Sequence, residues 1–189
     1  LYCREKIMTK LPADKGKGDW LVQFILKHGL VYGAELGVQK GINLKYLLEN
    51  VPHLHMIGID IWSDKSVRFN ETKSEDLQKD TTSINYGFYT SLLEYAKTVH
   101  PRLVLHRHFT SYATKFVEEG SLDFAFIDAG HEYEDVKTDI RNWYTKIKVG
   151  GYLLGHDINQ PQVRKAVNEV LGANNWSIAK RQKIWYVKR

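Results

Sequence analysis

Four acidic residues lie at or just past the ends of apolar runs that are typical of β-strands: Glu35, Asp60, Asp128 and Asp157. In a doubly wound sheet, ligands bind outside the carboxyl ends of the strands. We therefore expect these four carboxylates to lie along one edge of a sheet and to face a ligand there.

A glycine-rich segment, residues 33–41, lies between an apolar run and an amphipathic run. The order strand, turn, helix is how a nucleotide-type cofactor is seated in such a sheet. Gly37 and Gly41 let the backbone turn sharply and let a ligand approach it closely. Asp60 follows Gly41 by about 20 residues, where an acidic side chain accepts hydrogen bonds from both ribose hydroxyls.

The charge of this segment indicates which cofactor binds. The pattern Glu35-x-Gly37-x-x-x-Gly41 lacks the G-x-G pair of a dinucleotide site and places a carboxylate in the turn. A carboxylate there repels a pyrophosphate but suits a phosphate-free ligand that carries an ammonium and a sulfonium. S-adenosylmethionine is such a ligand. The alternative is a turn without any ligand, because glycine-rich turns also serve packing.

Asp128 and Asp157 follow the expected fourth and fifth strands. If these strands are neighbours, the two carboxylates start about 5 Å apart. Each then raises the pKa of the other unless a cation lies between them. Mg²⁺ prefers such oxygen ligands, and Asn159 or Asp64 would complete the set. The alternative is that one aspartate only caps the turn or helix that follows it.

His131 follows Asp128 by three residues, and Gly130 leaves the intervening backbone free to turn inward. An imidazole with a pKa near neutrality can take a proton from a substrate hydroxyl. The alternative is a histidine that only forms hydrogen bonds within its loop. Thr110 and Ser111 end the third strand, where a hydroxyl or a backbone amide can meet the edge of an adenine.

Composition limits the class of protein. The chain has 189 residues, 43% of them hydrophobic, and a single cysteine, Cys3. This predicts one domain, excludes a disulfide framework and a thiolate zinc site, and favours a cytoplasmic setting. No apolar run approaches the roughly 18 residues of a membrane span. Basic residues gather in the last segment, after residue 163, so binding to nucleic acid stays a less favoured alternative.

Helices and strands alternate along most of the chain. The sequence predicts helices at 20–27, 42–51, 85–98, a fourth ending at 119, then 133–147 and a last one from 161, with strands at 30–32, 55–60, 102–106, 122–127, 152–155, 176–179 and 184–187. Such alternation indicates a Rossmann-like, doubly wound α/β fold whose mostly parallel sheet has helices on both faces. Residues 1–19 are expected to form an N-terminal arm, 20–189 a single domain, and 61–82 a lid loop over the cofactor edge.

Several of these motifs together resemble class I S-adenosylmethionine-dependent methyltransferases. The matching segments are Gly33–Gly37 with Gly41, Gly58–Asp60, Phe126–Tyr133 and Lys148–Asp157. Within that superfamily the chain is most similar to the small-molecule and sugar O-methyltransferases, which include macrolide-sugar enzymes and cephalosporin-hydroxylase-like proteins. The resemblance covers about residues 20–189.

The resemblance implies a seven-stranded sheet with an antiparallel C-terminal strand. It implies cofactor contacts from Glu35, Gly37, Asp60 and the region of Ser111, to which the turn and the strand ends add Gly41 and Asp128. In metal-dependent members, residues matching Asp128 and Asp157 hold Mg²⁺ and a histidine matching His131 is the base. Ile158 stands where other members carry a further ligand, so the third protein ligand, Asn159 in our prediction, stays open.

The expected function is transfer of a methyl group from S-adenosylmethionine to a hydroxyl of a small molecule or sugar, with Mg²⁺ as a second cofactor. Two alternatives stay open. One is a nucleic-acid methyltransferase recruited by the basic C-terminal segment, and the other is a cofactor-binding module without catalysis. Assembly into a homo-oligomer also stays open. A nicotinamide-dependent reductase is disfavoured by Glu35.

Overall fold

The computed structural model describes residues 16–63 and 81–189. Its centre is a seven-stranded sheet with the order β3-β2-β1-β4-β5-β7-β6. The strands are β1 (Tyr32–Leu36), β2 (His55–Asp60), β3 (Leu103–Arg107), β4 (Leu122–Ile127), β5 (Ile147–Gly155), β6 (Ser177–Ala179) and β7 (Ile184–Lys188). Strands β1 to β5 pair in parallel, and β7 runs antiparallel to both of its neighbours. The predicted fold class is confirmed.

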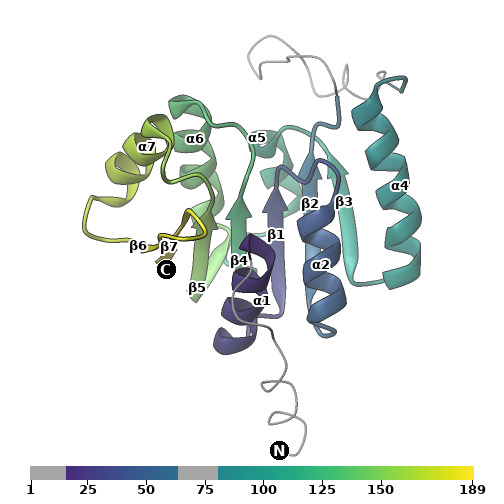
Figure 1. Ribbon diagram of the computed structural model, residues 1–189, viewed down its shortest axis with the longest axis horizontal. Coiled ribbons are helices and arrows are strands. Elements are labelled where there is room, and N and C mark those ends of the chain that lie inside the picture. Colours follow the sequence, from purple (N-terminus) through teal and green to yellow (C-terminus); the bar gives the residue numbers. More distant parts are fainter. Residues whose placement is uncertain (1–15, 64–80) are drawn as a thin grey trace, which may run out of the picture.

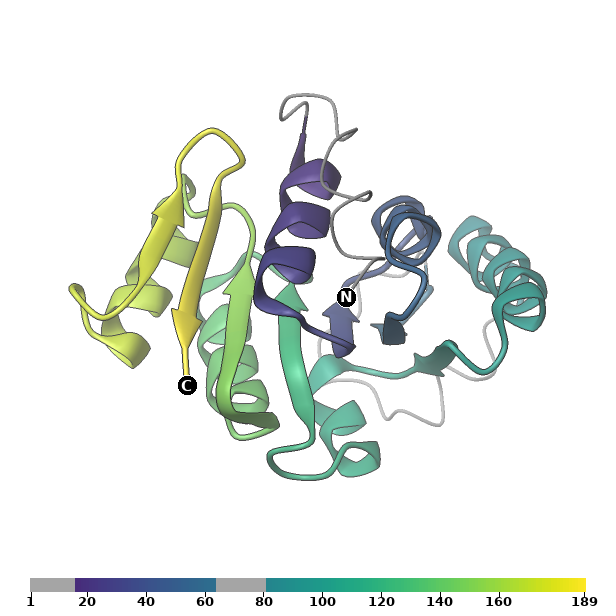
Figure 2. The same ribbon diagram turned by 90° about the horizontal axis from the view of Figure 1, so that it is seen from below.

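Helices cover both faces of the sheet. They are α1 (Lys17–His28), α2 (Ile42–Asn50), α4 (Ile84–Val99), α5 (Thr110–Ala113), α6 (Tyr133–Tyr144) and α7 (Pro161–Leu171), with a 3-10 turn, η1, at Thr114–Phe116. Helices α1, α2 and α4 lie on one face, and α5, α6 and α7 lie on the other (Figures 1 and 2). The carboxyl ends of the parallel strands therefore meet at one edge between two helical layers.

Two hydrophobic clusters, one on each side of the sheet, form the core. Strand β4 is buried along its whole length, and its side chains alternate between the clusters. Ala125 and Ile127 belong to the cluster under α6 and α7, whereas Phe124 and Phe126 belong to the cluster under α1 and α2. A period of two along a strand buried on both faces explains the continuous apolar run in the sequence.

The first strand begins and ends later than the sequence predicted. We expected it at 30–32, with the glycine-rich turn starting at Gly33, but β1 continues through Glu35 to Leu36. Gly33 is paired with Met56 of β2 and with Phe124 of β4. A Cβ added to Gly33 would lie 2.3 Å from the ring of Phe124. The absence of a side chain at residue 33 therefore makes room for Phe124 inside the sheet, and the turn itself begins at Gly37.

Two helices are shorter than predicted. Helix α6 ends at Tyr144, so Ile147 and the pair Gly150-Gly151 lie in β5. Ile147 still faces the core, which explains why it continued the apolar spacing of the helix. After β3, α5 and η1 end at Phe116 because Val117 is already extended, with φ −124° and ψ 125°.

The boundary of the N-terminal arm is also different. Helix α1 begins at Lys17, so residues 17–19 are helical and belong to the helix layer on one face of the sheet. Residues 1–15 of the predicted arm and residues 64–80 of the predicted lid lie outside the described residues. In the described ranges, none of the helices combines the length and the apolar character needed to cross a membrane.

Candidate functional site

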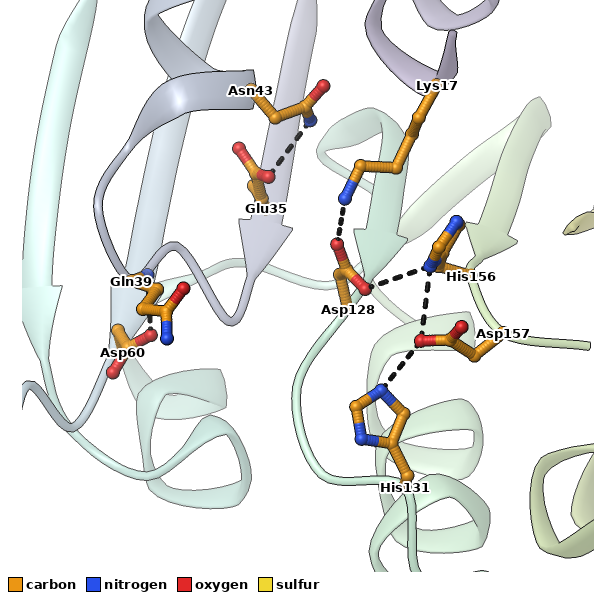
Figure 3. Close-up of polar contacts among 9 residues, drawn as sticks. All are labelled: Lys17, Glu35, Gln39, Asn43, Asp60, Asp128, His131, His156 and Asp157. Atoms are coloured by element: carbon orange, nitrogen blue, oxygen red, sulfur yellow. Dashed lines mark hydrogen bonds and ion pairs between the residues drawn. The ribbon is translucent and has the colours of Figure 1, made fainter. Parts of the chain in front are cut away.

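A cleft of about 1540 Å³ opens at the carboxyl ends of β1, β2 and β4. Its lining includes most of the residues that the sequence singled out: Glu35, Gly37, Asp60, Ser111, Asp128, His131 and Asp157. Figure 3 shows several of these side chains, which come from separate strands and loops. The tertiary structure thus gathers carboxylates that are far apart in the chain around one hollow.

The turn after β1 is held against the ends of two neighbouring strands. The Gly37 N–H donates to the carbonyl of Ile59, and the Asp128 N–H donates to the carbonyl of Leu36, both at 2.8 Å. Gly37 has a φ of +88°, and a Cβ there would lie 2.2 Å from the carbonyl oxygen of Asp128. Only glycine fits this position, because both the conformation and the space exclude a side chain.

Asp60 is fixed between two loops at the end of β2. Its Oδ2 accepts the backbone N–H of Gln39 at 2.8 Å (Figure 3). Its Oδ1 accepts the backbone N–H of Trp62, also at 2.8 Å. The Trp62 indole Nε1–H donates to the carbonyl of Gln39 at 2.8 Å, which joins the two loops directly. Burial raises the pKa of Asp60, and the backbone N–H groups oppose that rise.

Glu35 is a buried carboxyl with one unused oxygen. The side chain is 2% exposed, and Asn43 on α2 donates its Nδ2–H to Oε1 at 2.9 Å. The other oxygen, Oε2, has no hydrogen-bond partner among the residues that the structure describes. Burial, with a smaller contribution from Asp128, raises the pKa of Glu35 to about 8. Asn43 was not predicted, and only its place in the first turn of the following helix hints at it.

Asp128, His131 and Asp157 form a compact group. One ligand atom from each lies within 4.8 Å of the other two. His131 Nε2 is 2.8 Å from Asp157 Oδ2, and His156 Nδ1 is 3.1 Å from the same oxygen (Figure 3). Asp157 has a φ of +55°, a conformation in which aspartate is tolerated and which turns its side chain toward the group. The proximity of Asp128 and Asp157 expected from neighbouring strands is therefore present.

A lysine from the other side of the cleft contacts this group. Lys17, the first residue of α1, donates a hydrogen bond from Nζ to Asp128 Oδ2. Burial opposes ionisation of Asp128, but His156 and Lys17 outweigh it and hold its pKa below the usual value. Burial likewise disfavours the charged form of His156, yet Asp128 and Asp157 raise its pKa. Lys17 was not predicted as a site residue, because it fell in the predicted arm.

Asp139 on α6 is a second functional candidate that the sequence did not reveal. It lines the cleft but is only 3% exposed, and the Thr110 hydroxyl donates to its Oδ1 at 2.5 Å. Burial raises the pKa of Asp139 to about 7. Ser111 follows Thr110 on α5 and lines the same part of the cleft.

Two predicted site residues lie elsewhere. Gly41 is the N-cap of α2, and a Cβ there would lie 2.3 Å from Leu92, so its glycine is explained by packing and by a φ of +73°. Asn159 is exposed after β5. Neither belongs to the lining of the cleft as far as the described residues form it. Asp64, the other candidate third ligand, lies outside the described residues.

Comparison with known proteins gives one distant curated relative and solved structures of the same fold. A curated, uncharacterized protein of Acanthamoeba polyphaga mimivirus is 27% identical over 154 residues, which are 77% of this chain and 61% of the relative. The chain thus spans about three fifths of that protein's length.

Three solved structures illustrate the shared fold. The O-methyltransferase NovP is 17% identical with a TM-score of 0.63, covering 89% of this chain and 76% of that one. CalS11, a TDP-rhamnose 3'-O-methyltransferase, is 14% identical with a TM-score of 0.63, covering 89% and 77%. An O-methyltransferase from Bacillus cereus, solved in complex with SAH, is 15% identical with a TM-score of 0.61, covering 95% and 84%. At these identities the likeness establishes a common fold.

The family model of a methyltransferase domain matches residues 34–158. This range begins inside β1 and ends just after β5, so it contains Glu35, Asp60, Asp128, His131 and Asp157. The chain therefore belongs to the methyltransferase-domain family.

Proposed function

We propose that the protein is an S-adenosylmethionine-dependent O-methyltransferase that acts on a hydroxyl of a small molecule or sugar. The single observation that carries this proposal is the unpartnered, buried Oε2 of Glu35 in a cleft that also presents Asp60. A buried acceptor without a partner is costly, and a ligand that donates to it removes the cost. The family and the O-methyltransferases that share the fold support the same function.

The donor would lie along the strand ends. Glu35 would accept hydrogen bonds from its ammonium end, Asp60 would accept the ribose hydroxyls, and the bare backbone of Gly37 would allow close approach. Ser111, with its neighbour Thr110, would meet the adenine edge. When bound, S-adenosylmethionine supplies a methyl group on a positively charged sulfur, ready for displacement.

His131 is our candidate for the base. Its Nε2 faces the carboxylate of Asp157 at 2.8 Å, so an Nε2–H donated to Asp157 leaves the lone pair on Nδ1. Nδ1 can then accept the proton of an acceptor hydroxyl while Asp157 orients the ring. The half-exposed ring, with 46% of the side chain accessible, can reach an acceptor in the cleft. Alignment of donor and acceptor would supply much of the remaining catalysis.

Asp128 and Asp157, with His131 beside them, also fit a divalent cation such as Mg²⁺. The two carboxylates would be the ligands and His131 would remain the base beside them; one ligand atom from each of the three residues lies within 4.8 Å of the other two. Such an ion would lower the pKa of an acceptor hydroxyl and orient it. Asn159 remains our prediction for a third protein ligand, although its side chain is exposed after β5.

The test is transfer of a radiolabelled methyl group from S-adenosylmethionine to pools of hydroxylated sugars and small molecules, with RNA in a separate arm. We expect labelling of a small-molecule hydroxyl and none of RNA. Calorimetry with S-adenosylhomocysteine measures the donor site independently. Binding without transfer to any pool would favour a non-catalytic module, and absence of binding would refute the proposal.

The role of a metal is tested separately. The double variant D128N/D157N should lose metal-stimulated transfer and still bind S-adenosylhomocysteine. Glu94→Gln, an exposed carboxylate on α4 paired with Lys97, is the matched control and should leave both unchanged. Undiminished transfer in excess chelator would remove the metal from the reaction.

A further inference from the structure

The carboxylate that we propose as a metal ligand already has a cation from the protein itself. Lys17 Nζ binds Asp128 Oδ2, and the other oxygen of Asp128 faces His156 Nδ1 at 3.5 Å. Figure 3 shows Lys17 reaching down from α1 to the end of β4. Both oxygens of Asp128 are thus engaged by nitrogen atoms.

This contact is more sheltered than an ordinary surface ion pair. The side chain of Lys17 is 31% exposed and that of Asp128 is 15% exposed, whereas the Lys97–Glu94 pair on α4 is 69% and 71% exposed. The Lys17 ammonium also lies 5.7 Å from the centre of the Phe126 ring. Partial burial reduces screening by water, so the charge of Lys17 acts strongly on whatever binds beside Asp128.

Lys17 binds Oδ2, and Oδ1 is the oxygen on the side of His156 and Asp157, so a divalent ion held between Asp128 and Asp157 would share the carboxylate with Lys17. Two cations bound to one carboxylate lie a few ångströms apart and repel each other. From this geometry, and resting on the function proposed above, we propose that Lys17 and a divalent cation compete for Asp128. Lys17 is the resident cation of the site, and a metal ion binds only when the lysine side chain leaves it.

The position of Lys17 at the start of α1 means that replacing it by a metal ion requires only its own side chain to move. It is the first residue of the helix and lies between Gly16 and Gly18. The first buried residue of α1 is Leu21. The long lysine side chain can therefore swing away from Asp128 without disturbing the core. Metal occupancy is then coupled to the conformation at the start of α1, outside the matched family domain.

The experiment measures Mn²⁺ binding to the full chain by electron paramagnetic resonance and calorimetry. We expect Lys17→Met to bind Mn²⁺ at least tenfold more tightly than the wild type, and Lys17→Arg to bind it as weakly as the wild type. Lys97→Met removes an exposed, paired lysine of α4 and should change nothing. Adding D128N to K17M should abolish the gain, because the ion would lose the carboxylate for which it competes with Lys17.

A K17M variant that binds Mn²⁺ no better than the wild type would overturn the competition. So would a gain that survives D128N. If K17M fails to fold by circular dichroism, Lys17→Gln takes its place. Chemical acetylation of wild-type Lys17, read by mass spectrometry, should increase when Mn²⁺ is added, and an unchanged rate would also overturn the proposal.

S-adenosylhomocysteine binding is followed in the same samples. Failure of the wild type to bind it would refute the proposed function. Normal binding of S-adenosylhomocysteine without any effect of Lys17 on Mn²⁺ would refute only the competition.

Discussion

At the scale of single residues, the surroundings of each carboxyl in the cleft decide its charge. Asp128 has Lys17 and His156 beside it, and its pKa lies below the usual value. Among the described residues, the hydrogen-bond donors to Glu35 and Asp139 are the neutral groups of Asn43 and Thr110, and burial raises the pKa values of both carboxyls. The three carboxyls thus differ in protonation near neutral pH because cationic groups bind Asp128 directly, whereas burial dominates at Glu35 and Asp139.

The raised pKa of Glu35 predicts that donor binding releases a proton. With a pKa of about 8, Glu35 is largely protonated at pH 7 in the free protein. The positive charges of S-adenosylmethionine would stabilise the carboxylate and lower that pKa. Calorimetry at pH 7 in two buffers of different ionisation enthalpy should therefore give different apparent binding enthalpies. Glu35→Gln should remove the difference, and equal enthalpies for the wild type would contradict this role.

Asp139 predicts a pH-dependent cost to stability. Its pKa of about 7 in the folded state lies above its ordinary value of 3.8, so the folded protein binds the extra proton. Stability is then lost as pH rises from about 4 to about 7, by up to about 4 kcal/mol for a shift of this size. Asp139→Asn should raise the free energy of unfolding at pH 8 by a few kcal/mol, and less at pH 5.

Urea denaturation at pH 5 and pH 8 measures this effect. Glu94→Gln on the exposed face of α4 is the control and should change stability little at either pH. A gain from D139N that does not grow with pH would show that Asp139 ionises normally in the folded protein.

At the scale of elements, the turn after β1 joins three strand ends. Its hydrogen bonds run from Gly37 to Ile59 of β2 and from Asp128, after β4, to Leu36. The same turn leads to Gln39, whose N–H fixes Asp60. A change in the path of this turn would therefore displace several candidate donor contacts together.

Gly37→Ala should test this turn. The added Cβ would meet the carbonyl of Asp128 at 2.2 Å in addition to adopting a φ of +88°. We expect a loss of several kcal/mol of stability and loss of S-adenosylhomocysteine binding, because the backbone around Asp128 must move to make room for the Cβ. Gly120→Ala is the matched control, since its φ is +65° with open space around the Cβ. It should cost only about 1–2 kcal/mol and preserve binding. Equal effects of the two variants in denaturation and calorimetry would contradict the account.

At the scale of the whole molecule, the C-terminal hairpin completes the sheet beside the candidate site. Strand β7 pairs with β5, and Trp185 lies opposite Gly155. A Cβ on Gly155 would lie 2.4 Å from the Trp185 indole, so the glycine lets the ring pack closely against the backbone of β5. Gly155 directly precedes His156 and Asp157, which ties the packing of the hairpin to the site.

Trp185→Ala should therefore destabilise the protein by about 3–5 kcal/mol, the usual cost of emptying a buried aromatic position. Trp185 is 1% exposed. Trp176→Ala is the matched control, because Trp176 is only partly buried and should cost clearly less. Guanidinium unfolding followed by circular dichroism compares the two. Similar costs would show that the hairpin contributes little through Trp185.

The sequence by itself determined the fold class, the strands that end in acidic residues and the glycine of the turn. These features are local: apolar spacing distinguishes strands from helices, and glycine marks a turn. The errors arose where packing overrode the local pattern. Gly33 resembled a turn residue, yet it lies within a strand that has partners on both sides. Gly150, with a φ of +87°, and Gly151 lie inside β5 where its register with β4 shifts.

Only the tertiary structure decided which groups meet in the cleft. Lys17 and Asp128 are 111 residues apart, and Thr110 and Asp139 are 29 apart. Such contacts depend on how α1 and α6 pack across the strand ends, and no spacing in the chain encodes them. Burial is likewise a property of the assembled layers, so the raised pKa values of Glu35 and Asp139 and the engagement of Asp128 by Lys17 became visible only in three dimensions.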